Sequence, residues 1–354
     1  MRHSGMASPR IRVCFTASRG SIVAAALHRI LGSRSCSRMM ERPTRSTQST
    51  TRLSLESFMV SASDLNVPQA PIRVAVAQTD PRLNDVPHNQ NIVRQMTLQA
   101  AEQDAKLVVF PECMLTGYCF ASRQEGLDNG LDIDGPEIAD VIRLAAQTQM
   151  HIALGFVEVD RTGATEKLYN TAVLITPQGR VHAYRKVHLP DLGVDRFVDT
   201  GDLPITVFDT DIGRIAFSIC YEARFPEHSR VLALQGVQLL LHITNLPRIA
   251  NAVVDVLLPA RALENHVFVL SSGRIGLERN YQFLGHSRIF GLQGEILARA
   301  SGDTVELITA DLSPAQADLK TQTIDAQDGK PDPHQFRMFS DRHPELYGLI
   351  SHSN

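Results

Sequence analysis

Three residues of this sequence could act together as a nucleophile, a base and a cation. Cys220 closes an apolar stretch that begins at Arg214, and a charged turn follows it. A thiol in such a place can attack a carbon atom when a base and a cation lie beside it. Glu112 and Lys186 are the candidates, because a carboxylate can take and return a proton and an ammonium group stabilises an oxyanion. This set of residue types suits hydrolysis of a carbon–nitrogen bond through a thioester.

Each of these residues follows a predicted strand. Glu112 comes after the apolar strand 106–110, Lys186 ends a hairpin strand, and Cys220 ends the strand 214–219. Catalytic groups of α/β proteins gather at the ends of sheet strands. We therefore expect the sheet to bring the three side chains together.

Strands and helices alternate along the chain from residue 71 onward. The apolar patterns predict strands at 71–78, 106–110, 151–157, 169–175, 237–243 and 266–271, with helices from about residue 89 and at 137–149, 226–234 and 259–265. Segments 176–184 and 288–297 have the glycine turns of hairpins, so they add antiparallel pairs. The pattern predicts an α/β fold with a mixed sheet.

Composition excludes several classes of protein. The chain has 354 residues with 43% hydrophobic residues, and no apolar stretch approaches the roughly 20 residues that span a bilayer. Residues 1–60 carry +8 of a total charge of −3, which leaves −11 on the rest. An acidic body does not favour nucleic acid, so we expect small-molecule partners. The five cysteines form no CxxC pair, which favours a reducing compartment.

We expect three parts along the chain. Residues 1–70 form a basic leader rich in serine and arginine, either an organelle transit peptide or an extension ahead of a later start. Residues 71–313 form the folded domain. Residues 314–354 form a C-terminal extension that packs on the domain or on a partner subunit. The expected location is the cytoplasm, or an organelle such as the mitochondrion if the leader is a transit peptide.

The chain resembles the nitrilase superfamily of carbon–nitrogen hydrolases, in its amidase and carbamoylase branch, over about residues 71–348. The segments around Glu112, Lys186 and Cys220 are similar to its three signatures, in the same order. Further similar segments lie at 168–172, 193–198, 261–265, 283–289 and 341–347. The resemblance implies an αββα sandwich of mixed sheets flanked by helices, assembled as a homodimer or a higher homo-oligomer.

The resemblance also implies roles for residues. Cys220 would be the nucleophile, Glu112 the general base and Lys186 the cation beside the tetrahedral intermediate. The backbone N–H of Tyr221 would complete the oxyanion hole, with no metal and no organic cofactor. Relatives have a second Glu seven residues before a Gly, a position that counts back from Gly201 to Val194 here. The nearest carboxylate is Asp195, which we expect to fill this role after a one-residue shift.

Other residues near the signatures are weaker candidates. Tyr118, Glu222 and Arg224 could support the site or line a substrate pocket, and Glu222 stands where relatives often have Asp. An ion pair between Arg224 and Glu227 that braces the turn is the favoured alternative. Cys113 should face away from the site, because neighbouring side chains of an extended strand point to opposite faces. Cys119 is also expected to be structural. His188 and His228 would be partners of a papain-type dyad, whose surrounding motifs are missing.

The favoured function is hydrolysis of a small linear amide or N-carbamoyl amine by water, through a thioester on Cys220. Nitrile hydrolysis is the alternative within the family. Relatives that hydrolyse nitriles usually have Trp directly after the nucleophile, whereas this chain has Tyr221 and no Trp. A non-catalytic binding or assembly protein is the alternative from another class, and the intact Glu, Lys and Cys argue against it.

Overall fold

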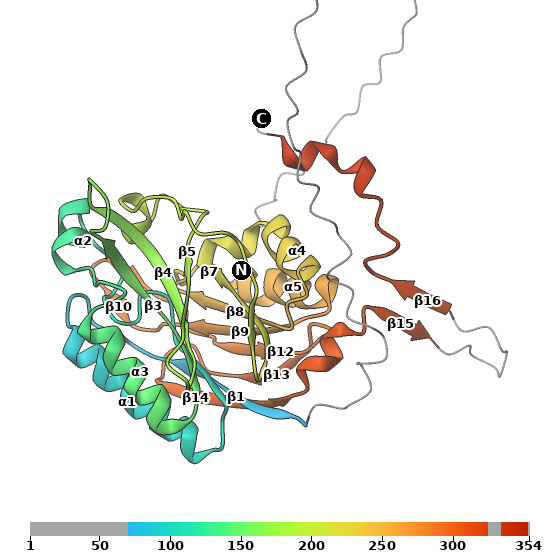
Figure 1. Ribbon diagram of the computed structural model, residues 1–354, viewed down its shortest axis with the longest axis horizontal. Helices are drawn as coiled ribbons and strands as arrows, with labels where there is room; N and C mark the ends of the chain where they lie inside the picture. The colour runs from blue at the N-terminus through green and yellow to red at the C-terminus, as the bar shows by residue number, and fades with distance from the viewer. Residues whose placement is uncertain (1–69, 325–333, 353–354) are drawn as a thin grey trace, which may run out of the picture. The chain divides into compact units, whose positions relative to one another are not determined.

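The computed structural model describes residues 70–324 and 334–352, and within these ranges two six-stranded sheets stack face to face (Figure 1). The first sheet has the order β14-β1-β2-β3-β4-β5 and the second has the order β13-β12-β9-β8-β7-β6. The first contains β1 (Ile72–Gln78), β2 (Leu107–Val109), β3 (His151–Asp160), β4 (Lys167–Ile175), β5 (Val181–Arg185) and β14 (Glu306–Leu312). The second contains β6 (Phe208–Thr210), β7 (Gly213–Ile219), β8 (Leu239–Thr244), β9 (Phe268–Gly273), β12 (Arg288–Phe290) and β13 (Ile296–Arg299).

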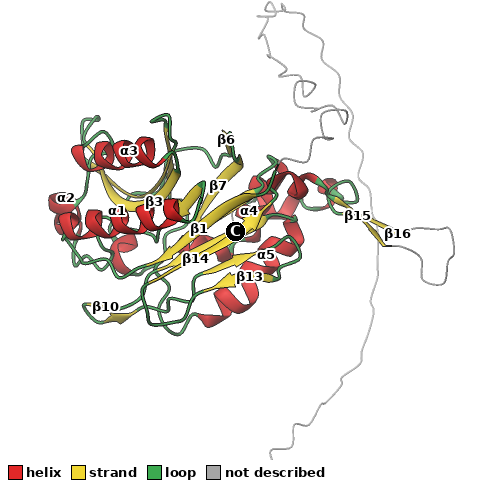
Figure 2. Cartoon of the chain, turned by 90° about the horizontal axis from the view of Figure 1, so that it is seen from below, coloured by secondary structure: helices red, strands yellow, loops and turns green. Residues whose placement is uncertain are grey.

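Helices cover the outer face of each sheet (Figure 2). α1 (Val86–Glu102) and α3 (Pro136–Thr148) pack on the first sheet, and α4 (Pro226–Leu234) and α5 (Leu258–Asn265) pack on the second. The alternation of side chains along β1 explains why both faces of the first sheet are covered. Val74 and Val76 join the core between the sheets, whereas Ala75 and Ala77 pack under the helices. Strands that are apolar on both faces are typical of sheets buried on both sides. The expected αββα sandwich is confirmed.

Parallel pairs occupy the middle of each sheet and antiparallel pairs its edges. β1, β2 and β3 are parallel, as are β7, β8 and β9, and each parallel step is joined by at least one helix. β4, β5 and β14 pair antiparallel in the first sheet, and β6, β12 and β13 do so in the second. The carboxyl ends of β2, β7 and β8 therefore lie where side chains of the two sheets can meet.

Local sequence explains most element boundaries. α1 begins at Val86, three residues earlier than predicted, because the Asp85 side chain accepts a hydrogen bond from the backbone N–H of His88. The strand predicted to begin at His266 begins at Phe268 instead, because His266 ends α5 in the left-handed conformation with φ of 49°. α4 has the predicted bounds.

The chain beyond β14 contacts the second sheet and its helices. Asp318 pairs with Arg214 and accepts a hydrogen bond of 2.8 Å from Gln238 Nε2. Lys320 Nζ donates to the carbonyl oxygens of Asn265 and His266, at 2.9 Å each. A two-stranded hairpin follows, formed by β15 (Thr321–Ile324) and β16 (His334–Arg337). The predicted leader lies outside the described residues, and the predicted division into three parts stays a prediction.

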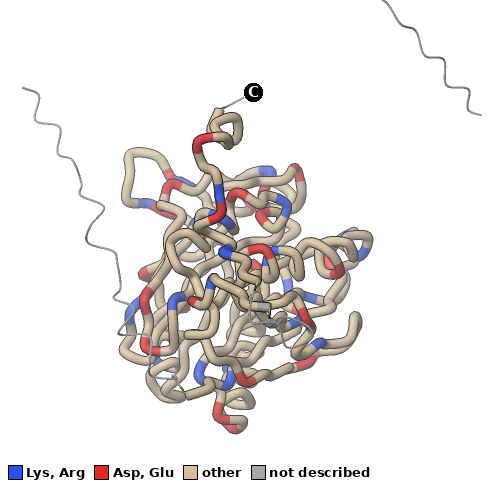
Figure 3. The backbone as a smooth tube through the Cα atoms, turned by 90° about the vertical axis from the view of Figure 1, so that its right-hand side faces the viewer, with Lys and Arg blue, Asp and Glu red and all other residues tan. Residues whose placement is uncertain are grey.

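Two further features concern the described part of the chain as a whole. None of its helices is long and apolar enough to cross a membrane. Lys and Arg are interspersed with Asp and Glu along the chain (Figure 3). The smaller elements include α2 (Arg123–Asn129) and the hairpin of β10 (Leu277–Glu278) and β11 (Tyr281–Gln282).

Candidate active site

A buried lysine lies between two buried carboxylates. Lys186 Nζ lies 2.8 Å from Glu112 Oε1 and 2.7 Å from Asp195 Oδ2, and all three side chains are fully enclosed. Glu112 is in the turn after β2, and Lys186 directly follows β5. Asp195 comes from the 3₁₀ turn η3 (Gly193–Arg196). The structure thus brings together Glu112, Lys186 and the carboxylate that the one-residue shift selects.

Neutral donors complete the hydrogen bonds of this ion cluster. Asn170 Nδ2 on β4 donates to Glu112 Oε1 at 2.8 Å and to Asp195 Oδ1 at 2.9 Å. The backbone N–H of Asn245, just after β8, donates to Glu112 Oε2 at 2.8 Å. The Tyr118 hydroxyl donates to Asp195 Oδ2 at 2.7 Å. Two carboxylates and one ammonium leave an excess negative charge, and these dipoles stabilise it in the absence of a second cation.

Cys220 begins the 3₁₀ turn η4 (Cys220–Arg224) where β7 ends. Its φ of 50° lies in the left-handed region, which is uncommon for a residue with a Cβ atom and recurs at functional sites. The side chain is buried, and the charges of Glu112 and Lys186 both act on its sulfur. The nucleophile candidate from the second sheet is therefore within electrostatic reach of the ion cluster of the first.

Burial sets the protonation states at this site. It raises the pKa of the Cys220 thiol to about 12, and the nearby Glu112 charge acts in the same direction. Burial also raises the pKa of Glu112, against the opposing effect of Lys186. Burial alone would lower the pKa of Lys186, but Asp195 and Glu112 raise it well above its ordinary value. The resting site therefore holds a thiol beside a charged lysine.

Glu222 is buried outside this cluster and connects the segments that contain Lys186 and Cys220. Its Oε2 accepts a 2.8 Å hydrogen bond from the backbone N–H of Ile219, next to Cys220. Its Oε1 accepts bonds from the Val187 N–H at 3.1 Å and the Tyr184 hydroxyl at 2.6 Å. Burial alone would raise the pKa of Glu222, but hydrogen bonds from His188, Ile219 and Tyr184 lower it to about 2. Glu222 therefore holds the Lys186 segment against the Cys220 segment.

The other predicted residues lie around this core. The Tyr221 ring packs edge-on against Phe225, with centroids 5.1 Å apart. Arg224 and Glu227 are both exposed, and no ion pair joins them in the described structure, so the predicted brace is wrong. Arg224 ends η4 and Glu227 lies in the first turn of α4, and water can solvate both side chains. Neither histidine forms the papain-type dyad, because His188 Nδ1 and His228 Nε2 face Glu222, at 3.4 and 3.8 Å.

Cys113 lies closer to the site than predicted. The alternation of side chains requires an extended strand, but β2 ends at Val109 and Cys113 lies in a turn with φ of 50°. Its Sγ consequently lies 3.6 Å from Oδ1 of Asn170, the residue that bridges both carboxylates. Cys119 is buried elsewhere, beside Glu278.

Sequence reasoning missed two residues that contact Glu112. Asn170 lies inside the segment 168–172 that carried part of the family resemblance, and Asn245 follows β8. The only sequence signal for Asn170 and Asn245 was their position within or directly after an apolar strand. An amide side chain has no distinctive spacing, so neither stood out.

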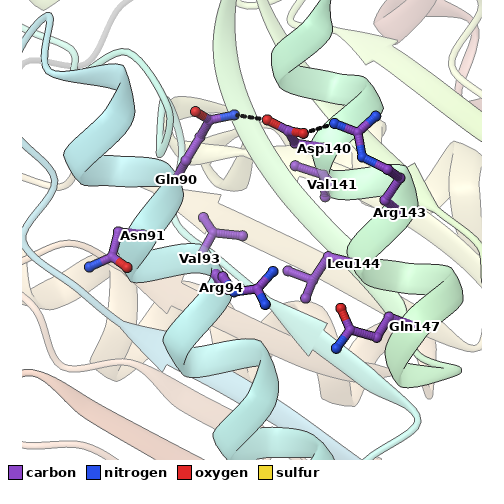
Figure 4. A pocket seen from close by; sticks show the side chains of 9 residues that line it. All are labelled: Gln90, Asn91, Val93, Arg94, Asp140, Val141, Arg143, Leu144 and Gln147. Atoms are coloured by element: carbon purple, nitrogen blue, oxygen red, sulfur yellow. Dashed lines mark hydrogen bonds and ion pairs between the residues drawn. The ribbon is translucent and has the colours of Figure 1, made fainter.

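A groove of about 270 Å³ lies between α1 and α3, away from these residues (Figure 4). Its walls include Gln90, Arg94, Asp140 and Arg143, and Figure 4 shows the chain of contacts from Gln90 through Asp140 to Arg143. Because both helices lie on the outer face of the first sheet, the groove is separate from the ion cluster. In residues 70–324 and 334–352, no group of three acidic, histidine or cysteine side chains is placed to hold a metal ion.

The sequence matches a known protein family. The sequence pattern of the family named carbon-nitrogen hydrolase matches residues 73–320. The chain belongs to this family. A nitrilase from Pyrococcus abyssi is 34% identical over 244 residues, which covers 68% of this chain and 89% of that protein. An omega-amidase from Homo sapiens is 29% identical over 278 residues, covering 74% and 92%.

Solved structures of family members have the same fold. An amidase from Nesterenkonia sp. AN1 superposes with a TM-score of 0.63 at 25% identity, covering 79% of this chain and 97% of that one. That structure is a variant with the acetamide moiety of fluoroacetamide added covalently to the active site cysteine. This carbon-nitrogen hydrolase is therefore an enzyme of the nitrilase superfamily.

Proposed function

We propose that this carbon-nitrogen hydrolase cleaves small linear amides or N-carbamoyl amines through a thioester on Cys220. The observation that carries the proposal is the buried cluster of Glu112, Lys186 and Asp195 opposite a thiol at the end of β7. The omega-amidase and amidase names of two relatives support the choice of substrate class. Tyr221 directly after the nucleophile supports it further.

The first step is attack by the Cys220 sulfur on the carbonyl carbon. Glu112 takes the S–H proton as the C–S bond forms, because the raised pKa of Cys220 keeps the resting thiol protonated. The carbonyl electrons move to oxygen, and the Lys186 ammonium and the Tyr221 N–H stabilise the oxyanion. The product is a tetrahedral intermediate.

The second step releases the nitrogen. The oxyanion electrons restore the C=O bond, the C–N bond breaks, and Glu112 gives its proton to the departing nitrogen. Ammonia or an amine leaves, and the acyl group stays on sulfur. Water then attacks the thioester while Glu112 takes one of its protons and later returns it to sulfur. For an amide, the sum is amide plus water to carboxylic acid plus ammonia or an amine. For an N-carbamoyl amine, the acid released is a carbamic acid, which breaks down to carbon dioxide and the second nitrogen product, and the enzyme is unchanged in both cases.

A panel of substrates tests the proposal. The full chain should release ammonia from at least one short amide or N-carbamoyl amine, and Cys220→Ala should lose roughly 10⁴-fold in rate, because the nucleophile is gone. Cys119→Ser is the matched control and should retain activity. Turnover of nitriles alone would move the assignment to the nitrile branch, which the name of the Pyrococcus abyssi relative favours. No turnover of any panel member would contradict the proposal and favour a binding role.

A further inference from the structure

The side chain of Asn170 closes a ring of hydrogen bonds around the candidate base. Lys186 Nζ and Asn170 Nδ2 each donate to Glu112 Oε1, at 2.8 Å in both cases. The same two nitrogens donate to the two oxygens of Asp195, at 2.7 and 2.9 Å. All four side chains are buried. Donors and acceptors therefore alternate around the ring, with two acidic groups kept apart by one ammonium and one amide.

The Asn170 amide group donates hydrogen bonds that stabilise the excess negative charge of the cluster. Two carboxylates and one ammonium have a net charge of −1, and an unpaired buried charge is costly unless hydrogen bonds satisfy it. Asn170 also holds the lysine itself, because its backbone carbonyl accepts a 2.9 Å bond from the Lys186 N–H. Asn170 thus contacts all three charged members of the cluster.

The thiol of Cys113 acts on the orientation of this amide. Its Sγ lies 3.6 Å from Asn170 Oδ1, where the S–H can donate. If the Asn170 amide were flipped, so that its oxygen and nitrogen exchanged places, the oxygen would face two carboxylates and the NH₂ group would face a thiol. Both effects favour the observed orientation, and the repulsion by the carboxylates is the stronger of the two.

We propose that Asn170 is a positioning residue that fixes Glu112 and Asp195 on either side of Lys186, with its amide held in turn by Cys113. The inference rests on the proposed function of Glu112 as the base. A carboxylate offers about four lone-pair sites, and three donors already occupy those of Glu112, namely Lys186, Asn170 and the Asn245 N–H. One site is left for the thiol proton of Cys220. Asn170 thereby determines which side of the base is free.

The effect of removing the amide can be read from pH dependence. The titratable groups that face Glu112 are Lys186, Asp195, Cys220, Cys113 and Tyr118. Asn170 favours the ionised carboxylate, so its loss makes Glu112 bind a proton more readily. Below the resulting higher pKa the base is protonated, and the rate falls. The loss of rate on removal of the Asn170 amide should therefore be largest at acid pH and become smaller as pH rises.

The test compares Asn170→Leu with the wild type in kcat/KM from acid to neutral pH. We expect a loss of about 10- to 100-fold near neutral pH and an acid limb moved to higher pH. Thr171→Val is the matched control. Its hydroxyl is also buried on β4 and donates to a carboxylate, Glu158, outside the ring. The Thr171→Val variant should be less stable, but the acid limb of its kcat/KM profile should lie at the same pH as in the wild type. A uniform loss at every pH in Asn170→Leu would overturn the inference, because a purely structural defect has that form.

Two further measurements separate this inference from the proposed function. Cys113→Ala should move the limb in the same direction by less, and Cys113→Ser, which keeps a donor, should restore it. NMR of labelled glutamate carboxyls follows Glu112 without any turnover, with Glu112→Gln to assign its signal. An inactive wild type would contradict the proposed function alone. A Glu112 titration unchanged in Asn170→Leu would overturn the role of Asn170 whatever the activity.

Discussion

Burial acts in the same direction on the thiol of Cys220 and the carboxyl of Glu112, because both lose the water that stabilises their charged forms. The thiol stays protonated, with a pKa of about 12, and Glu112 becomes a stronger base than an exposed glutamate. Lys186 keeps its charge between two carboxylates. A concerted attack, with proton transfer to Glu112, fits this combination better than a resting thiolate.

The pKa of Glu112 gives a prediction for the acid limb of activity. A raised pKa means that the base is protonated, and turnover is lost, at a higher pH than the ordinary value of 4.5 would give. We expect kcat/KM to fall as pH decreases through a limb above that value. Circular dichroism over the same range shows whether the protein stays folded. A limb at or below pH 4.5 in the folded enzyme would count against Glu112 as a buried base.

At the residue scale, the sequence indicates the reacting groups and little of their support. The types of Cys220, Glu112 and Lys186 suggest their chemistry directly. The position seven residues before Gly201 is Val194, so the supporting carboxylate was found only by a shift of one residue to Asp195. Val194 packs in an apolar cluster with Tyr118. The 3₁₀ turn that contains both residues determines which of the two faces Lys186. Asn170 and Asn245 could not be predicted, because their roles depend on contacts between distant segments.

Among the elements, the turns after β5 and β7 place Lys186 and Cys220, the proposed cation and nucleophile. Glu222 connects them through the backbone N–H groups of Val187 and Ile219. The strands and helices that were predicted lie within a few residues of their observed bounds, because apolar periodicity follows burial on each face. β14, which is only partly buried, and the polar helix α2 were not predicted. The turns could not be predicted, since the left-handed conformations of Cys113 and Cys220 depend on the surrounding structure. The error over Cys113 arose at such a turn.

Substitution of Glu222 tests this connection through stability. Glu222→Gln should lower the free energy of unfolding near neutral pH by about 3 kcal/mol, since an amide nitrogen would face the N–H donors. The pKa of Glu222 is about 2 in the folded protein against an ordinary 4.5, so its stabilising effect is lost as pH falls between these values. Urea unfolding of both proteins at pH 7, 5 and 3 measures the difference. A difference that stays constant with pH would contradict the role of the charge.

At the scale of the molecule, two stacked sheets contribute to one site. Glu112, Lys186 and Asn170 come from the first sheet and its turns, while Cys220 and Asn245 follow strands of the second. The sequence predicts most of the strands and helices, but periodicity alone does not tell which sheet a strand joins. The αββα sandwich was predicted from the resemblance to a known family, and the structure confirms it.

The exposed apolar residues near the C-terminus bear on assembly. Leu346, Leu349 and Ile350 are 74%, 85% and 65% exposed, which is unusual for three such residues close together. We expect them to be covered by another subunit in a homo-oligomer. Light scattering should give at least twice the mass of the chain, and Leu349→Glu with Ile350→Glu should reduce it. A wild type that is monomeric at micromolar concentration would contradict this expectation.

The proposed mechanism requires a thioester on Cys220, which the mass of the trapped enzyme would reveal. The full chain is mixed with an amide that it hydrolyses, quenched in acid within the steady state, and digested for peptide mass spectrometry. We expect one acyl group on the Cys220 peptide, absent from Cys220→Ala and from a sample quenched before substrate is added. Turnover with the acyl group on Cys113 or Cys119 would contradict it, as would the same turnover in Cys220→Ala.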